Sequence, residues 1–168
     1  MKLVWGAVLG VALAGTAVAQ THSDKSFMET ASQGNVAEVE MAKLALKKSE
    51  NADVRAFAER MIKDHETLGK KMAPFMAQAG VKPSYSMNTE HQHIFNKLNG
   101  LSGEEFDKQY AEAMDKDHHE DLKDFRSEAN STKDVQLKAA VLEGEKVIAE
   151  HTHMADELAQ KLGMPVAS

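Results

Sequence analysis

The sequence predicts an all-α fold: a four-helix bundle with a short extra helix in the long connection between the second and third long helices. Four long segments carry apolar residues at the three- and four-residue spacing that gives a helix one apolar face. Two of the intervals between them are only about three residues long, as expected for antiparallel helix pairs. No segment alternates apolar and polar residues between turn signals, so we expect no β-sheet.

The first 19 residues have the pattern of a secretory signal peptide. Lys2 precedes an apolar run from Leu3 to Val18, and the small residues Ala17-Val18-Ala19 indicate cleavage after Ala19. This run is shorter than the ~20 apolar residues that span a bilayer, and no second run follows it. We therefore expect an exported, periplasmic protein with no transmembrane segment.

Composition narrows the classes of partner and ligand. The formal net charge of −6 argues against nucleic acid or anionic lipid as a partner, and nothing in the sequence identifies a protein partner. The absence of cysteine excludes disulfides and thiolate metal ligands. The ten methionines can fill an irregular core or supply thioether ligands for copper.

The bundle is expected to span residues 25–163, between an N-terminal tail and a C-terminal tail. Residues 20–24 are predicted to be a flexible tail in which His22 is solvated. The first helix is predicted over residues 25–49 and the second over residues 52–79. The short turn Asn51-Ala52-Asp53 makes these two helices an antiparallel pair.

The second helix pair follows a connection that runs from Gly80 to Leu101. A short helix is predicted within it over residues 89–98, ended by Asn99-Gly100. The third long helix is predicted over residues 102–128, the fourth over residues 133–162, and residues 164–168 form the tail. The connection is long enough for the second and third helices to run either parallel or antiparallel.

Several motifs carry a resemblance to a known family. They are Gly34–Glu40, Val54–Met61 with Asp64-His65, Gly103–Asp107 with Met114 and Asp117-His118, and finally His151. Together they resemble the bacterial exported proteins grouped as domain of unknown function 4142. That resemblance implies a ferritin-like four-helix bundle and brings no established activity.

Each long helix places one potential metal ligand in the middle of its apolar face: Glu38, His65, His118 and His151, in chain order. The pattern Met-x-Lys-Asp-His occurs twice, at residues 61–65 and 114–118. Glu38, His65 and His118 are expected at similar heights near mid-helix. Counted from the turn at Asn130, His151 lies about eight residues further along its helix than His118, or roughly 12 Å.

Two interpretations of these inward side chains remain open. In the first, they form a hydrogen-bonded polar cluster that fixes the helix register. In the second, they bind a transition metal, because imidazole and carboxylate suit zinc, copper or iron. Met61 and Met114, each one turn before a histidine, and Met154, one turn after His151, would add soft ligands suited to copper.

Copper or zinc fits the pattern better than a di-iron centre. A ferritin-type di-iron site needs Glu-x-x-His on two helices, but Ile62 and Ile148 stand three residues before His65 and His151. We find no motif for a nucleophile, a phosphate loop or covalent haem, so no catalytic residue is assigned.

The sequence therefore leads to two hypotheses about function. The first is an exported, periplasmic metal-binding bundle that buffers copper or zinc or protects the envelope from metal stress. The alternative is a non-catalytic envelope or stress protein that acts through its surface, with purely structural inner histidines. The remaining histidines His91, His93, His119 and His153 are weaker candidates for a role.

Overall fold

The computed structural model describes residues 22–167 and contains five α-helices and no strand within that range. The helices are α1 (His22–Lys48), α2 (Ala52–Ala79), α3 (Thr89–Asn99), α4 (Gly103–Ser131) and α5 (Val135–Lys161). The all-α prediction is confirmed, including the short helix in the connection. The expected signal peptide lies outside the described residues.

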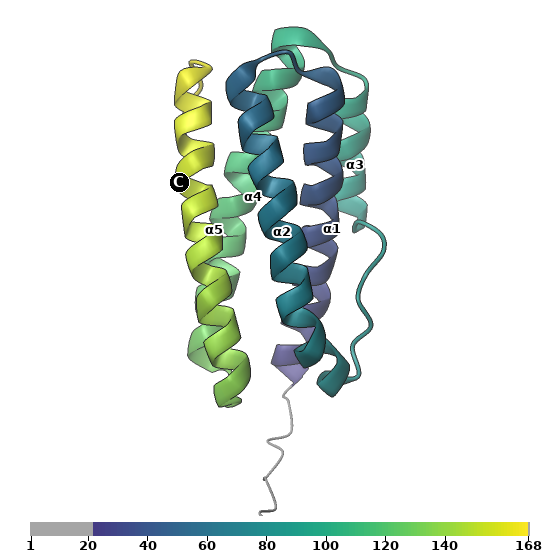
Figure 1. Cartoon of the computed structure of the whole chain (residues 1–168), viewed down its shortest axis with the longest axis vertical. Coiled ribbons are helices and arrows are strands. Elements are labelled where there is room, and N and C mark those ends of the chain that lie inside the picture. Colours follow the sequence, from purple (N-terminus) through teal and green to yellow (C-terminus); the bar gives the residue numbers. More distant parts are fainter. Residues whose placement is uncertain (1–21, 168) are drawn as a thin grey trace, which may run out of the picture.

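The four long helices run up, down, down and up along the bundle (Figure 1). After α2, the connection and α3 return along the outside of the bundle, so that α2 and α4 run parallel (Figure 1). Packing is most extensive within the α1–α2 and α4–α5 hairpins, and thinner contacts join α1 to α4 and α2 to α5. One long crossover of this kind is the topology of ferritin-like bundles.

Side-chain caps fix where two of the long helices begin. Asn51 Oδ1 accepts hydrogen bonds from the backbone N–H groups of Asp53 and Val54 at 2.9 and 3.4 Å, which satisfies two donors at the start of α2. Asp134 does the same at the start of α5. At its other end α2 stops at Gly80, whose φ of 70° is readily adopted only by glycine.

The helix α1 begins three residues earlier than Lys25, the predicted start. Asp24, expected in a solvated tail, is 1% exposed and forms a side-chain hydrogen bond with Glu128 near the end of α4. This contact with a distant helix holds the start of α1 against the bundle. The turn between α4 and α5 also lies further along the chain than predicted, because α4 continues through Ser131.

The buried core consists of two apolar clusters, one towards each end of the bundle. Near the boundary between the two clusters, each long helix carries a buried acidic or imidazole side chain that reaches the middle of the bundle. These side chains are Glu38, His65, His118 and His151. No helix within residues 22–167 is both long and apolar enough to cross a bilayer.

Candidate metal centre

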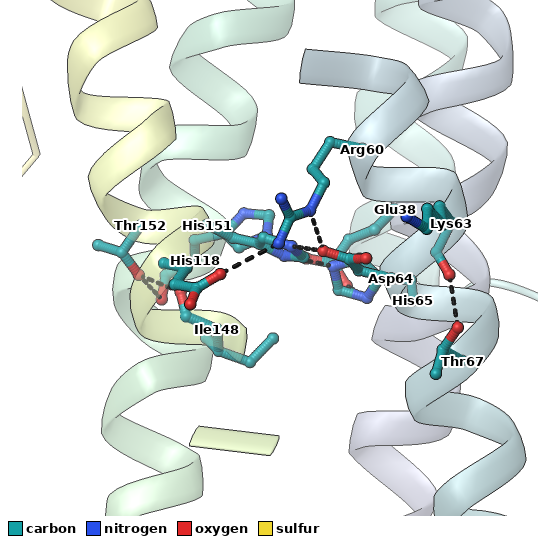
Figure 2. A network of polar contacts seen from close by, with 11 residues as sticks. Glu38, Arg60, Lys63, Asp64, His65, Thr67, His118, Ile148, His151 and Thr152 are labelled. Carbon is teal, nitrogen blue, oxygen red and sulfur yellow. Dashed lines mark hydrogen bonds and ion pairs between the residues drawn. The ribbon is translucent and has the colours of Figure 1, made fainter. Parts of the chain in front are cut away.

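Four polar side chains, one from each long helix, converge near the middle of the bundle (Figure 2). Each is at most 1% exposed: Glu38 of α1, His65 of α2, His118 of α4 and His151 of α5. We call these four residues the central cluster. All four side chains point into the bundle, as predicted.

The carboxylate of Glu38 lies between two imidazoles. Its Oε2 is 3.0 Å from Nδ1 of His65, and its Oε1 is 3.2 Å from Nε2 of His118. The other nitrogen of His65, Nε2, is 3.2 Å from Nδ1 of His151. The central cluster is therefore one continuous set of polar contacts that joins both hairpins of the bundle.

Two of the histidines are oriented by acceptors outside the central cluster. His118 Nδ1 lies 2.8 Å from the carbonyl oxygen of Met114, to which it donates its proton. His151 Nε2 likewise donates to Oδ2 of Asp64 at 3.1 Å. The remaining nitrogens, His118 Nε2 and His151 Nδ1, then carry lone pairs and face inward. Carbonyl and carboxylate partners of this kind orient the histidines of metal sites.

Asp64 is itself held in place by Arg60, one turn earlier in α2, which contacts its Oδ2 (Figure 2). Arg60 also donates to Glu150 of α5 at 3.1 Å. Partial burial would raise the pKa of Asp64, but the hydrogen bonds from Arg60 and His151 outweigh it and lower that pKa. The partner of His151 is therefore an ionised carboxylate.

Three inward atoms of the central cluster lack a hydrogen bond although they are fully buried. They are Glu38 Oε1, His65 Nδ1 and His118 Nε2. The contacts of the two nitrogens with the Glu38 carboxylate are short but lack the angles that a hydrogen bond requires. Buried polar atoms are rarely left in this state, because desolvation without a partner costs about 1–3 kcal/mol per group. One ligand nitrogen from each of His65, His118 and His151 lies within 4.8 Å of the other two.

Burial holds the three histidines neutral. Desolvation lowers the pKa of His65 well below its usual value, and the neighbouring His118 and His151 lower it further. Desolvation, helped by the charge of His151, brings the pKa of His118 to about 4. Burial also lowers the pKa of His151, although its hydrogen bond to Asp64 partly compensates. Neutral imidazole is the form that binds metals.

The pKa of Glu38 is shifted in the opposite direction, upwards. Burial raises its pKa well above the usual value, and the negative charges of Asp121 and Asp117 on α4 raise it further. Burial therefore favours the protonated, neutral form of Glu38, and a bound cation would favour the ionised form. His118 Nε2 and Glu38 Oε1 lie 3.2 Å apart, so a proton on Glu38 or a bound cation would relieve the repulsion between their lone pairs.

The predicted height of His151 was wrong. The expected 12 Å offset from His118 counted from a turn at Asn130, whereas α4 ends at Ser131 and α5 begins at Val135. Measured from these ends, His151 is only three residues further along its helix than His118, or about 4.5 Å. The length of an imidazole side chain spans that offset.

Asp64 was the partner that sequence reasoning missed, although the repeated Lys-Asp-His pattern contains the signal. In each copy the Asp just before the inward histidine contacts a histidine of another helix. Asp64 is 3.1 Å from His151, and Asp117 is 3.1 Å from Nε2 of His91 in α3. The side chain of His91, one of the weaker candidates from the sequence, is thus only 12% exposed against α4.

Of the three methionines expected as soft ligands, Met61 and Met114 are fully buried in the apolar cluster nearer the α1–α2 turn, and Met154 packs partly buried against it. Met114 contributes its main-chain carbonyl to the orientation of His118. Coordination through the sulfur of Met61 or Met114 stays a prediction.

A cavity of about 330 Å³, partly open to solvent, extends to the central cluster between α1 and α2. Its walls are mainly apolar and include Met72 and Phe125, while Glu38 and His65 are the cluster residues that line it. Asp121 adds a carboxyl group to the same wall. The cavity gives a small ligand or ion a route to the buried side chains.

These features define a class of protein: a helical bundle with one long crossover and a buried acid–imidazole cluster at its centre. The sequence profile of the family described as Domain of unknown function (DUF4142) matches residues 11–158, which is most of the chain. The chain therefore belongs to this family, as its motifs indicated.

The chain is also similar to the crystal structure of a DUF305 fragment from Deinococcus radiodurans. The TM-score is 0.70 and the identity 16%, over 87% of this chain and 99% of that one. At this identity the similarity establishes a shared bundle fold alone. No curated protein matches the chain.

Proposed function

We propose that this protein binds one transition-metal ion in the central cluster. His65, His118 and His151 would be the nitrogen ligands, and Glu38 would serve as a fourth ligand or as the partner that orients His65. The observation that carries the proposal is the convergence of three neutral imidazoles, two of which already donate a proton to an acceptor outside the cluster. His118 and His151, whose other nitrogens donate outward, therefore offer inward lone pairs to an ion.

The ligand set favours zinc or copper. Three imidazoles and a carboxylate match the donors that these ions take in proteins. A di-iron centre needs four or more inward carboxylates, whereas Glu38 is the single carboxylate of the central cluster. The ion would replace the proton that Glu38 otherwise retains, so binding releases protons and strengthens as pH rises.

The role that suits this site is storage or buffering rather than catalysis. The cluster is almost completely buried, and the partly open cavity beside it is mainly apolar. Together with the signal-peptide pattern of residues 1–19, this supports an exported protein that holds copper or zinc in the periplasm during metal stress.

The decisive experiment measures metal stoichiometry. A chain comprising residues 20–168, which contains all five helices, is stripped of metal and titrated with Zn²⁺ and Cu²⁺. His65→Ala and His118→Ala should each lower the bound metal by one ion per chain. His153→Ala, which removes a histidine that is 75% exposed, is the matched control and should change nothing.

The alternative is a bundle that acts through its surface and uses the cluster only to fix helix register. It predicts that His65→Ala and His118→Ala lower the melting temperature but leave the metal content unchanged. It also predicts that added metal does not raise the melting temperature of the wild type. Those results together would refute metal binding in the central cluster.

A further inference from the structure

A second group of potential ligands lies where α4 and α5 pack together. It consists of Asp115 and His119 from α4 and Asp156 from α5. His119 Nε2 is 2.9 Å from Oδ1 of Asp156 and 3.6 Å from Oδ1 of Asp115. One ligand atom from each residue lies within 4.8 Å of the other two. We call these three residues the α4–α5 site.

Asp115 shows that this group is more than a surface ion pair. Its side chain is 4% exposed, and its Oδ1 is buried without a hydrogen bond. Its other oxygen, Oδ2, accepts the backbone N–H of Ala167 at 2.7 Å, so the C-terminal segment fixes the carboxylate. A buried carboxylate oxygen without a donor is costly unless a cation neutralises it.

The α4–α5 site is separate from the central cluster, although His118 and His119 are neighbours in sequence. Consecutive residues of an α-helix point about 100° apart, so the two rings leave α4 on different sides. His118 is fully buried, whereas the side chains of His119 and Asp156 are 22% and 26% exposed. An ion can therefore reach this second group from solvent without passing through the core.

We propose that Asp115, His119 and Asp156 form a second, solvent-accessible site for one divalent transition-metal ion such as Zn²⁺. The ligand atoms are the two Oδ1 atoms and His119 Nε2. Two carboxylates balance the charge of the ion, and the imidazole favours zinc over magnesium or calcium. Three protein ligands leave a coordination position for water, which suits an ion that exchanges with solvent. This site does not depend on metal binding by the central cluster.

The test is a Zn²⁺ titration of the metal-stripped chain of residues 20–168. Bound zinc is measured by equilibrium dialysis, and the histidine side chains are followed by long-range ¹H–¹⁵N NMR. In the wild type, binding of one Zn²⁺ ion should shift the Nε2 signal of His119. His119→Ala and Asp156→Asn should each weaken the Zn²⁺ affinity of this site, measured by dialysis, by more than the roughly 10–100-fold typical of an outer-shell partner. His153→Ala, with its exposed histidine 3.4 Å from Glu157 on the same helix, is the control and should leave it unchanged.

Both variants change partly exposed side chains, and circular dichroism verifies that they remain folded. The proposal is overturned if both folded variants bind as much Zn²⁺ as wild type, or if the His119 signal does not respond to zinc. The effects of His119→Ala and His65→Ala separate the two proposals. If His119→Ala removes an ion and His65→Ala does not, the α4–α5 site stands and the central site fails; the reverse result overturns the α4–α5 site alone.

Discussion

Acid should destabilise the metal-free protein because three histidines are buried in their neutral form. The pKa values of His65, His118 and His151 are lowered in the folded state. In the unfolded chain a histidine titrates near its free value of about 6.5. Below that pH the unfolded chain binds more protons than the folded chain, so the free energy of unfolding falls as pH falls. For His118 the fall continues until the pH approaches its folded pKa of about 4.

The magnitude can be worked out for His118 alone. With a folded pKa of about 4 and an unfolded value of about 6.5, linkage gives a loss of about 2 kcal/mol between about pH 7 and about pH 5. Glu38 opposes this loss, because its raised pKa lets the folded chain keep a proton that the unfolded chain releases above about 4.5. The pH dependence of the free energy of unfolding is therefore the difference between these opposing contributions. A variant that lacks His118 isolates the contribution of that histidine.

The assay compares wild type with His118→Gln by urea unfolding in metal-free buffer, followed by circular dichroism at both pH values. Wild type should lose about 2 kcal/mol more than the variant between about pH 7 and about pH 5. This difference does not depend on what the substitution costs in packing. His153→Gln, at an exposed position, should behave as wild type. Equal pH dependence of wild type and His118→Gln would refute the buried, neutral state of His118.

Three further outcomes follow from the structure. Gly144→Ala should destabilise the bundle by about 1–3 kcal/mol in urea unfolding, because its Cβ would lie 2.5 Å from a ring carbon of Phe125. Gly100→Ala, whose Cβ would meet nothing closer than 3.4 Å, is the matched control, and equal stability of the two would contradict the packing at Gly144. Asn51→Ala should cost about 1 kcal/mol in the same assay by removing the α2 cap; no loss would mean that the cap does not contribute. Asp64→Asn should weaken zinc binding roughly 10–100-fold without abolishing it, and unchanged affinity would show that Asp64 does not orient His151.

The helices could be predicted well because their signals are local. Apolar spacing and the caps at Asn51 and Asp134 lie within a few residues of the boundaries that they determine. The start of α1 was missed for the opposite reason. Polar residues precede Lys25, and what holds them in the helix is the contact between Asp24 and Glu128, about a hundred positions apart in the chain. A single sequence does not reveal such a partner.

The inward orientation of the four ligands could be predicted because the angular position of a residue depends only on its own helix. Relative height was harder, since it depends on the turn from which both helices are counted. Placing the α4–α5 turn early lengthened the count to His151 and shortened the count to His118, so the two errors added to the overestimated offset. The outer partners Asp64 and Asp156 depend on rotamers and on neighbouring helices, which a helical wheel does not describe.

The central cluster draws two residues from each hairpin, Glu38 and His65 from one, His118 and His151 from the other. Contacts between the hairpins are thinner than those within them. An ion bound by residues of both hairpins would have to lose ligands from one hairpin before the two hairpins can separate. If each hairpin forms first, from its local contacts, and the two dock afterwards, an ion bound between them would lengthen the lifetime of the assembled bundle rather than speed its assembly.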